Sequence, residues 1–404
     1  MVRQVLTLTM GLGVMLAGAA GAGAQTAPPP QVQKQAQELQ TRIQTRIQER
    51  ITTSQALTER IHQIIQTTVG AQVARDLSRE LGRTARDVAR GVDSLHAIPG
   101  SFDQSRDYKF EQKDTQTKTL AIGATGALTL KNVVGDITVR VGSGKDVTVE
   151  IIRVSKGKSD ADAKLGLEKV TADVTAQAEH GSVTARYPND LHPSYAVSVA
   201  YNVTAPAGTR VWAESIAGNV TLTGLQGELK AKTVSGKLDV VSCTKVSSLH
   251  TTAGAIAVTD SRSDTKMDIG GISADVRLTN VKAPQVSATV VSGSIVAHDV
   301  QAEGADLDSL SGNIEYSGAV AAKGRYEFTT FNGNVRLALT GGFDLEGKTF
   351  SGKVEADAAL NLTTTVPAGS SDRQHSLRGT TGNGGAAVVA TTFSGNVWVG
   401  RKLQ

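Results

Sequence analysis

The chain has 404 residues, of which 39% are hydrophobic, 4% are aromatic and one, Cys243, is a cysteine. A lone cysteine excludes an intramolecular disulfide, so we expect Cys243 to be a buried core or turn residue. The net charge of +4 lies before residue 96, because 31 Lys and Arg balance 31 Asp and Glu from there onward. A neutral region poor in aromatic residues lacks the basic surface and stacking platforms that nucleic-acid binding uses, which excludes nucleic acid as a partner.

Residues 1–24 have the pattern of a secretory signal peptide. Arg3 precedes an apolar run, and Ala22-Gly23-Ala24 precedes Gln25, where we expect cleavage. The alternative is an uncleaved anchor, but the apolar run is short for a bilayer span. No later stretch approaches the ~20 apolar residues that a spanning helix needs. The sequence therefore predicts export to the periplasm or the cell exterior, with no membrane span after cleavage.

A Pro-rich linker at 25–30 leads into a predicted helical segment, 31–97. Its apolar residues recur mostly at steps of three and four, with a break at Gly70 and an end at Pro99-Gly100. The register drifts from a strict heptad, which favours an amphipathic hairpin or a loose coiled coil, with self-association as a possible role. Three arginines line one flank, which leaves a membrane-surface helix as an alternative: Arg42, Arg46 and Arg50.

Residues 98–117 are expected to form a linker and a first strand, and residues 118–209 an N-terminal β part. Within this part, 159–170 has the composition of one short helix with Ser159 at its N-cap. We expect that helix to lie across the end of a strand stack and to shield an open strand edge.

From 210 to 404 one short phrase recurs: an apolar residue, a small residue, glycine, a small polar residue or lysine, and another apolar residue. From Gly218 to Gly352 the steps are 18, 18, 20, 19, 19, 21 and 19 residues, with Ala274 replacing the glycine once. Such a period predicts an array of similar units, with a turn at each glycine and strands on both sides. The predicted turn glycines are Gly135, Gly218, Gly236, Gly254, Gly293, Gly312, Gly333, Gly352 and Gly395.

Stacking these units in register gives a mainly β protein, a parallel β-solenoid (β-helix-like) of ~19-residue repeats. The rival fold is a sandwich of antiparallel hairpins, but Ser-Gly-Asn is a poor two-residue hairpin turn. The 43 residues from Gly352 to Gly395 are expected to hold two further rungs, with a Ser/Gly-rich loop at 367–386.

Several segments in this order resemble the bacterial "putative adhesin" β-strand-repeat family, a domain of unknown function in exported and envelope proteins. They are the opener Leu128-Thr129-Leu130-Lys131-Asn132-Val133-Val134-Gly135-Asp136-Ile137-Thr138-Val139, the inserted helix, Tyr201-Asn202-Val203-Thr204-Ala205-Pro206-Ala207-Gly208-Thr209, and rungs such as Val234-Ser235-Gly236-Lys237-Leu238. The resemblance covers about 118–400 and implies adhesion, but it supplies no binding residues.

No catalytic, cofactor-binding or metal-binding residue is predicted. Residues 342–349 satisfy the phosphate-loop expression, yet a strand pattern follows them instead of the helix that a phosphate site needs. Asp306 and Asp308 are interpreted as two solvent-facing positions on one strand. The histidines have no metal-ligand spacing: His62, His96, His180, His192, His250, His298 and His375.

Three functions remain open. The leading hypothesis is a non-enzymatic exported solenoid that presents a repetitive face to a surface, a glycan or an envelope partner, because repetition favours multivalent binding. The alternative is a periplasmic envelope scaffold that uses segment 31–97 to hold a partner. A polysaccharide-active β-helix enzyme is the third, and it requires acids and bases that converge across rungs.

Overall fold

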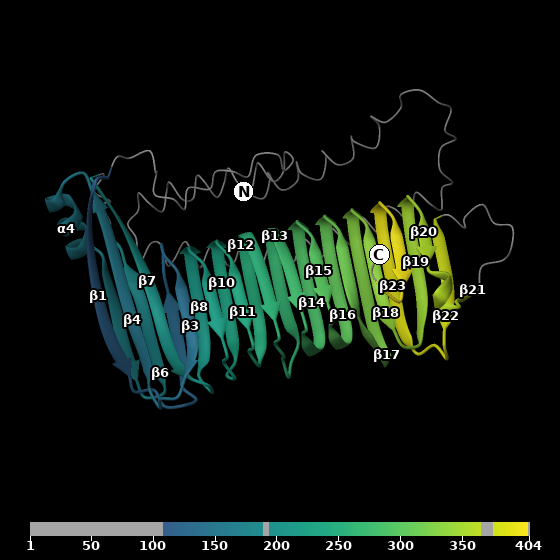
Figure 1. Cartoon of the computed structure of the whole chain (residues 1–404), viewed down its shortest axis with the longest axis horizontal. Helices are drawn as coiled ribbons and strands as arrows, with labels where there is room; N and C mark the ends of the chain where they lie inside the picture. Colours follow the sequence, from purple (N-terminus) through teal and green to yellow (C-terminus); the bar gives the residue numbers. More distant parts are fainter. Residues whose placement is uncertain (1–107, 189–193, 365–374, 403–404) are drawn as a thin grey trace, which may run out of the picture.

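The computed structural model describes residues 108–188, 194–364 and 375–402. The predicted signal peptide, the Pro-rich linker and segment 31–97 lie outside the described residues. The described part is mainly β, as predicted, and contains one α-helix and one 3-10 helix (Figure 1). Its strands form a long stack in which each strand lies across the long axis (Figure 1).

Each repeat forms one rung of this stack, with a strand, a bend at the repeat glycine, a second strand and a turn to the next rung. In the rung of Gly236, β10 (Leu229–Ser235) precedes the bend and β11 (Leu238–Val241) follows it. Both strands pair in parallel and in register with their equivalents in the preceding rung, β8 and β9. The repeats therefore form a parallel solenoid, as predicted, and not an antiparallel sandwich.

The strands before the bends form one side of the stack, which we call wall A. In spatial order wall A comprises β5 (Thr171–Gln177), β6 (His180–Arg186), β2 (Ala127–Lys131), β8 (Arg210–Ala217), β10, the first part of β12 (Val246–Thr259), the first part of β13 (Met267–Thr279), β14 (Lys282–Ser292), β16 (Gln301–Ser311), the second part of β17 (Ile314–Asn332), β23 (Ala386–Ser394), β19 (Phe343–Ser351), β22 (Ser376–Thr381) and β21 (Thr363–Thr364).

The strands after the bends form the opposite side, wall B. In spatial order wall B comprises β1 (Phe110–Leu120), β4 (Val147–Gly157), β7 (Tyr195–Pro206), β3 (Ile137–Gly142), β9 (Val220–Thr223), β11, the second parts of β12 and β13, β15 (Ile295–His298), the first part of β17, β18 (Val335–Thr340), β24 (Val397–Gly400) and β20 (Val354–Ala356).

The core is a continuous apolar strip that runs the length of the stack. Alternate residues of both walls point into it, so each rung contributes equivalent positions, such as Leu229 and Ala231 from wall A and Leu238 and Val240 from wall B, all at most 1% exposed. Each fully buried Val or Leu side chain contributes about 1.5–3 kcal/mol. The low aromatic content follows from this narrow section, which small aliphatic side chains fill.

The repeat glycine is required by contact between rungs. A Cβ at Gly312 would lie 2.0 Å from the carbonyl oxygen of Gly293, and a Cβ at Gly333 would lie 2.1 Å from that of Gly312. The backbone conformation makes the same demand, because φ is 156° at Gly312. The Gly312 N–H also donates to Asn332 O in the next rung at 2.9 Å. The bends therefore stack backbone on backbone, with no room for a side chain.

The residue after the glycine explains why the phrase is so often Ser-Gly-Asn. Asn313 Oδ1 accepts from the backbone N–H of Asn334 at 2.8 Å, and Asn334 Oδ1 accepts from that of Asn396 at 2.8 Å. Asn396 in turn accepts from the N–H of Lys353 at 2.9 Å. Each side chain thus satisfies a backbone donor that the bend frees from strand pairing.

A hydroxyl three residues before most glycines closes the inside of the bend. Thr330 Oγ1 donates to Gly312 O at 2.9 Å, Thr392 Oγ1 to Gly333 O at 2.8 Å, and Thr349 Oγ1 to Gly395 O at 2.8 Å. These threonines are at most 7% exposed, so the bonds satisfy polar atoms that would otherwise be buried at a cost.

Among the rungs from Gly218 to Gly352, the rung of Ala274 lacks the repeat glycine and exchanges two positions. Ala274 occupies the glycine position, and Gly271 occupies the position that holds a hydroxyl residue in most rungs. A Cβ at Gly271 would lie 2.4 Å from the Cβ of Ala274. The methyl group at 274 therefore fills the space that a threonine side chain fills elsewhere, and β13 continues through this bend without a break.

A second recurring turn, which the sequence analysis did not predict, joins wall B to the next rung. The residue six positions after the repeat glycine has positive φ in successive rungs: Gly224, Ser242, Asp260, Asn280 and Asp299. Gly, Asn and Asp adopt this conformation most readily. The next residue points into the core, which places Cys243 in one column with Leu225 and Val281, each at most 1% exposed. Cys243 is therefore a core residue, as expected.

The rungs do not follow sequence order at the C-terminal end. The rung of Gly395 lies between those of Gly333 and Gly352, because β23 pairs with both β17 and β19, and β24 pairs with both β18 and β20. The expectation of two further rungs after Gly352 is therefore wrong. After β20 the chain forms a 3-10 helix (Ala358–Leu360) and β21, and β22 pairs antiparallel with β19 before the chain returns (Figure 1). β22 also occupies part of the expected loop 367–386.

The N-terminal end uses the same arrangement. The rung of Gly135, formed by β2 and β3, lies between the β6–β7 rung and the β8–β9 rung. Antiparallel strands close the stack beyond it, with β4 and β1 on wall B and β5 on wall A. The helix α4 (Asp160–Lys169) begins after Ser159, whose hydroxyl accepts from the N–H of Asp162, and it contacts β4, β1 and β7 at this end (Figure 1).

We predict that Gly312→Ala lowers the free energy of unfolding by about 3 kcal/mol, because it combines backbone strain with a collision against Gly293 O. Gly123→Ala is the matched control: it also has positive φ (73°), but open space surrounds it, so the loss should be about 1 kcal/mol. Urea titration followed by circular dichroism measures both. Equal losses in the two variants would show that contact between rungs is unimportant.

The exchange at 271 and 274 predicts a coupled pair. Gly271→Ser alone should destabilise the protein by about 2 kcal/mol, because the new side chain collides with the Ala274 methyl group. Adding Ala274→Gly should restore most of the loss by recreating the usual rung. A double-mutant cycle in urea measures this coupling, and additive losses would contradict it.

Candidate binding faces

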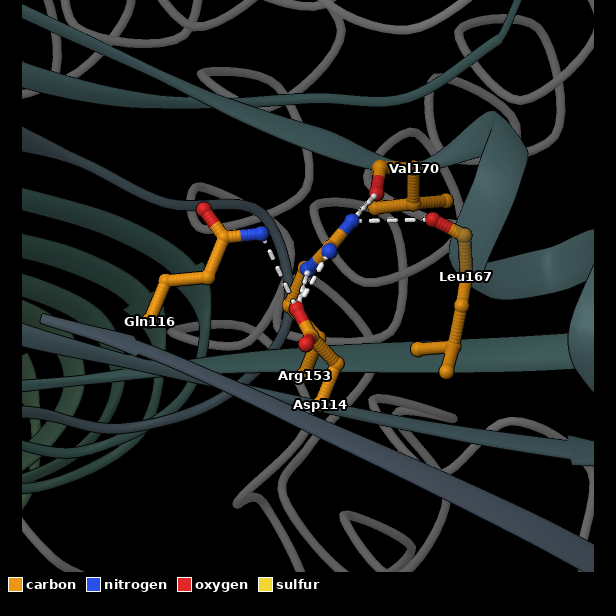
Figure 2. A network of polar contacts seen from close by, with 5 residues as sticks. All are labelled: Asp114, Gln116, Arg153, Leu167 and Val170. Atoms are coloured by element: carbon orange, nitrogen blue, oxygen red, sulfur yellow. Dashed lines mark hydrogen bonds and ion pairs between the residues drawn. The ribbon is translucent and has the colours of Figure 1, made fainter.

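A polar cluster ties the N-terminal edge strand to the stack. Arg153 on β4 lies against Asp114 on β1, with Nε 3.1 Å from Asp114 Oδ2 and Nη2 in direct contact with the same oxygen. Its Nη1 donates to Leu167 O at 2.8 Å and to Val170 O at 2.7 Å, at the C-terminal end of α4 (Figure 2). One guanidinium thus joins β1, β4 and α4.

The charges in this cluster suit a structural role. Cationic side chains stabilise the exposed carbonyls at a helix C-terminus, and only 11% of the Arg153 side chain is exposed. The hydrogen bond from Arg153 holds the pKa of Asp114 below its ordinary value, and Gln116 Nε2 adds a second donor at 3.1 Å. The depression that these residues line beside α4 is shallow and open, so we interpret the cluster as a clamp on β1.

The outer face of wall A carries two kinds of column. The residue two positions before the glycine gives a mostly apolar column along the stack: Val133, Ile216, Val234, Thr252, Ile272, Val291, Leu310, Phe331, Phe393 and Phe350. Its last three members are stacked rings. Phe331 and Phe393 have centroids 4.6 Å apart, and Phe393 and Phe350 have centroids 4.7 Å apart. This order again places the Gly395 rung between its neighbours.

Beside the apolar column lies a group of carboxylates that we call the acidic patch: Asp268, Asp306, Asp308 and Glu327. In-register pairing places them on the rungs of β13, β16 and β17, with Asp306 opposite Glu327. The sequence interpretation of Asp308 as solvent-facing is wrong, because it is 7% exposed, as is Glu327. Asp308 and Glu327 point away from the core, because their sequence neighbours Leu307 and Phe328 are the residues that point inward.

The outer face of wall B is open and mixed in character. One outward column holds Thr223, Val241, Thr259 and Thr279 on successive rungs, all half-buried. Toward the C-terminal end Trp398 lies between Arg336 and Glu355, both of which are exposed. A Cβ at Gly400 would lie 2.1 Å from Trp398 Cη2, so the indole ring lies over the backbone of its own strand. The result is an aromatic surface with a cation and an anion on adjacent rungs.

The other residues considered in the sequence have these positions. Residues 343–351 form strand β19, and the Gly352 bend and strand β20 follow, so the phosphate-loop expression lies on a strand, as interpreted. His250 Nε2 lies 3.2 Å from Asp268 Oδ2, and His298 Nε2 lies 3.5 Å from Glu315 Oε1, each pair joining two rungs. In the part of the chain that the structure describes, no three His, Cys, Asp or Glu side chains form a group suited to a metal ion.

Burial raises the pKa of the Cys243 thiol, and among the described residues the cysteine forms no disulfide. No helix within those residues is long and apolar enough to cross a membrane.

Residues 220–400 match the family model described as Toastrack DUF4097. The matched segment, which we call the Toastrack segment, runs from β9 through β24, and it confirms the predicted resemblance to a β-strand-repeat family of unknown function. The opener and the inserted helix precede it.

A search of curated proteins found no match. Similar solved structures include a "putative adhesin" from Bacteroides fragilis, with 9% identity, TM-score 0.35, and coverage of 71% of this chain and 97% of that one. A "putative adhesin" from Parabacteroides merdae has 12% identity, TM-score 0.36, and coverage of 71% and 96%. A "putative lipid binding protein" from Parabacteroides distasonis has 9% identity, TM-score 0.35, and coverage of 72% and 97%. At these TM-scores the likenesses identify no ligand.

Sequence reasoning missed the acidic patch and the surface around Trp398. Their members are spread over tens of residues, and they meet only because equivalent positions stack. The available signal was the period itself, since aligning the rungs on their glycines places Asp306 beside Glu327. The same alignment fails for Trp398, because the Gly395 rung is out of sequence order.

We predict that Arg153→Met costs about 2 kcal/mol of stability, because it leaves the Asp114 carboxylate and two helix carbonyls without their donor. Arg153→Lys should recover only part, since an ammonium cannot span three acceptors. Lys156→Met is the control on the same strand pair: its 3.5 Å ion pair with Glu111 is exposed, so urea midpoints should hardly change.

The lowered pKa of Asp114 sets the pH dependence of this clamp. The carboxylate is held ionised in the folded state, so its contribution is present above the ordinary pKa of 3.8 and is lost as pH falls through the lower folded value. The stability difference between the parent protein and Asp114→Asn should therefore shrink below about pH 3.8. A difference that stays constant to pH 2.5 in urea titrations would contradict this assignment.

Proposed function

We propose that this protein is a non-enzymatic, exported, adhesin-like β-solenoid whose wall B binds a glycan of a surface or of the cell envelope. The observation that carries the proposal is the open outer face of wall B, where Trp398 lies over the backbone between Arg336 and Glu355. An aromatic ring that lies over a wall offers apolar area for the face of a sugar ring, and the flanking charges offer hydrogen bonds to hydroxyl groups.

The repeat architecture supports weak multivalent binding better than a single deep pocket. Parallel rungs repeat at about 4.8 Å, so the half-buried threonines of wall B and its charged residues recur at regular intervals along the stack. A polymer that contacts several rungs gains affinity through effective concentration, although each contact is weak.

The proposed location is the periplasm or the cell surface, and it rests on the signal-like pattern of residues 1–24. Protease added to intact cells distinguishes the two. Degradation on intact cells would agree with a surface adhesin, whereas protection until the outer layer is opened would favour the periplasmic scaffold.

We predict that Trp398→Ala weakens binding to isolated carbohydrate-rich envelope fragments about tenfold, a loss of about 1.4 kcal/mol. The chain has only two tryptophans, and the other, Trp212, lies on the outer face of wall A, so Trp212→Ala is a matched control that should bind normally. Co-sedimentation measures the affinity, and the tryptophan fluorescence of Trp212→Phe reports on Trp398 directly. Equal binding by both alanine variants would exclude wall B as the binding face.

A further inference from the structure

We propose that the glycan bound at Trp398 is acidic, a polymer of uronic acids, and that Arg336 binds the carboxylate of the sugar ring that contacts the indole. This inference rests on the proposed function, because it names the class of glycan for the same site. It also assigns a direction to the sugar, since the two charged neighbours of Trp398 have opposite signs.

The indole of Trp398 lies on a base of two small residues. It covers the backbone at Gly400, and Gly400 pairs with Ala338 on the neighbouring rung. Ala338 points outward, because its neighbours Leu337 and Leu339 are core residues, and it is only 5% exposed. Trp398 itself is half-buried, so part of its ring surface remains open to solvent. Such a surface suits the apolar face of a pyranose ring.

The surface around the indole carries an excess of positive charge. Four exposed cations lie on the rungs of β18, β24 and β20 or directly after β24, and among the described residues none of them forms an ion pair: Arg336, Lys353, Arg401 and Lys402. Two carboxylates stand against them. One is Glu355, and the other is Asp357, whose Oδ1 accepts from the N–H of Ala359 at 3.0 Å. The excess attracts an anionic ligand to this end of wall B.

Arg336 is available to a ligand because the acid opposite it has another partner. In-register pairing places Glu315 opposite Arg336, but Glu315 Oε1 lies 3.5 Å from His298 Nε2, on the rung beyond. Glu355 is two rungs from Arg336, about 9.6 Å away, with Trp398 between them. An exposed guanidinium in this position can bind a carboxylate through two parallel hydrogen bonds.

The rung spacing favours a uronic acid over other anionic polymers. Adjacent rungs are about 4.8 Å apart, so a sugar ring on Trp398 has its own substituents within reach of Arg336. In a uronic acid the carboxylate is attached directly to the ring, whereas a polyol phosphate has no ring to place on the indole. Glu355, on the other side of Trp398, can accept hydrogen bonds from ring hydroxyl groups. The two charges thus hold the ring in one orientation.

Removing the charge of the sugar without changing its backbone tests this inference. Trigalacturonate and its methyl ester are titrated into the full chain carrying Trp212→Phe, in which Trp398 is the remaining tryptophan and its fluorescence reports binding. We expect the acid to bind about tenfold more tightly than the ester, with a difference that shrinks at high salt.

The outcomes separate this inference from the proposed function. Equal affinities for acid and ester, or no binding of either while envelope fragments still bind through Trp398, would overturn the inference and leave the glycan face in place. Envelope fragments that bind Trp398→Ala as well as the parent protein would overturn both.

A matched pair of arginine variants tests the contact itself. Arg336→Gln should lower the affinity for trigalacturonate about tenfold and leave that for the ester unchanged. Arg277→Gln is the control, because Arg277 is exposed on the same outward column three rungs away and should not change the affinity. Arg336→Lys should retain part of the affinity, since an ammonium keeps the charge but not the planar fork. Equal losses in the two glutamine variants would show a general effect of positive charge and overturn the contact with Arg336.

Discussion

The structure depends on one repeated contact, the stacking of each repeat bend on the backbone of the bend before it. A Cβ at these glycines would lie 2.0–2.3 Å from a carbonyl oxygen of the neighbouring rung. Because the bends can approach only in register, every other position of the rung is also fixed relative to its equivalents. The hydroxyl, asparagine and phenylalanine columns are consequences of that single registration, and so are the two outer faces. The Ala274 rung shows how strict this registration is, because the Ala274 methyl group fits only where Gly271 has no side chain.

Much of the fold could be predicted from the sequence because the period and the alternation of inward and outward residues are local signals. The glycine spacing indicated the rungs and the bends, and Ser159 indicated the start of α4. The order of the terminal rungs could not be predicted. Gly395 differs from its neighbours in no local feature, and its place between Gly333 and Gly352 depends on pairings across tens of residues. The candidate faces were missed for the same reason, and Asp308 shows that alternation predicts the direction of a side chain but not its exposed fraction.

The two outer faces differ in the chemistry that they offer. Wall B alternates hydroxyl groups, charges of both signs and one tryptophan, and it is suited to polar ligands that many rungs contact weakly. Wall A combines a mostly apolar column with carboxylates, two of which, Asp308 and Glu327, are only 7% exposed.

The inserted rungs at both ends follow from the edge problem of any parallel stack. A solenoid whose last rung were exposed would present free backbone donors and acceptors to another copy and would tend to add further rungs. Here the outermost parallel strand on wall A pairs with an antiparallel strand at each end: β22 covers β19, and β5 covers β6. The chain then returns inward, so that the rungs nearest the two ends of the described sequence, those of Gly135 and Gly395, have neighbours on both sides. The arrangement requires pairing between residues far apart in sequence, which slows folding but leaves no parallel rung on wall A open for addition. Closure of the ends is thus part of what limits the stack to a fixed number of rungs, and the irregular order is the cost of that limit.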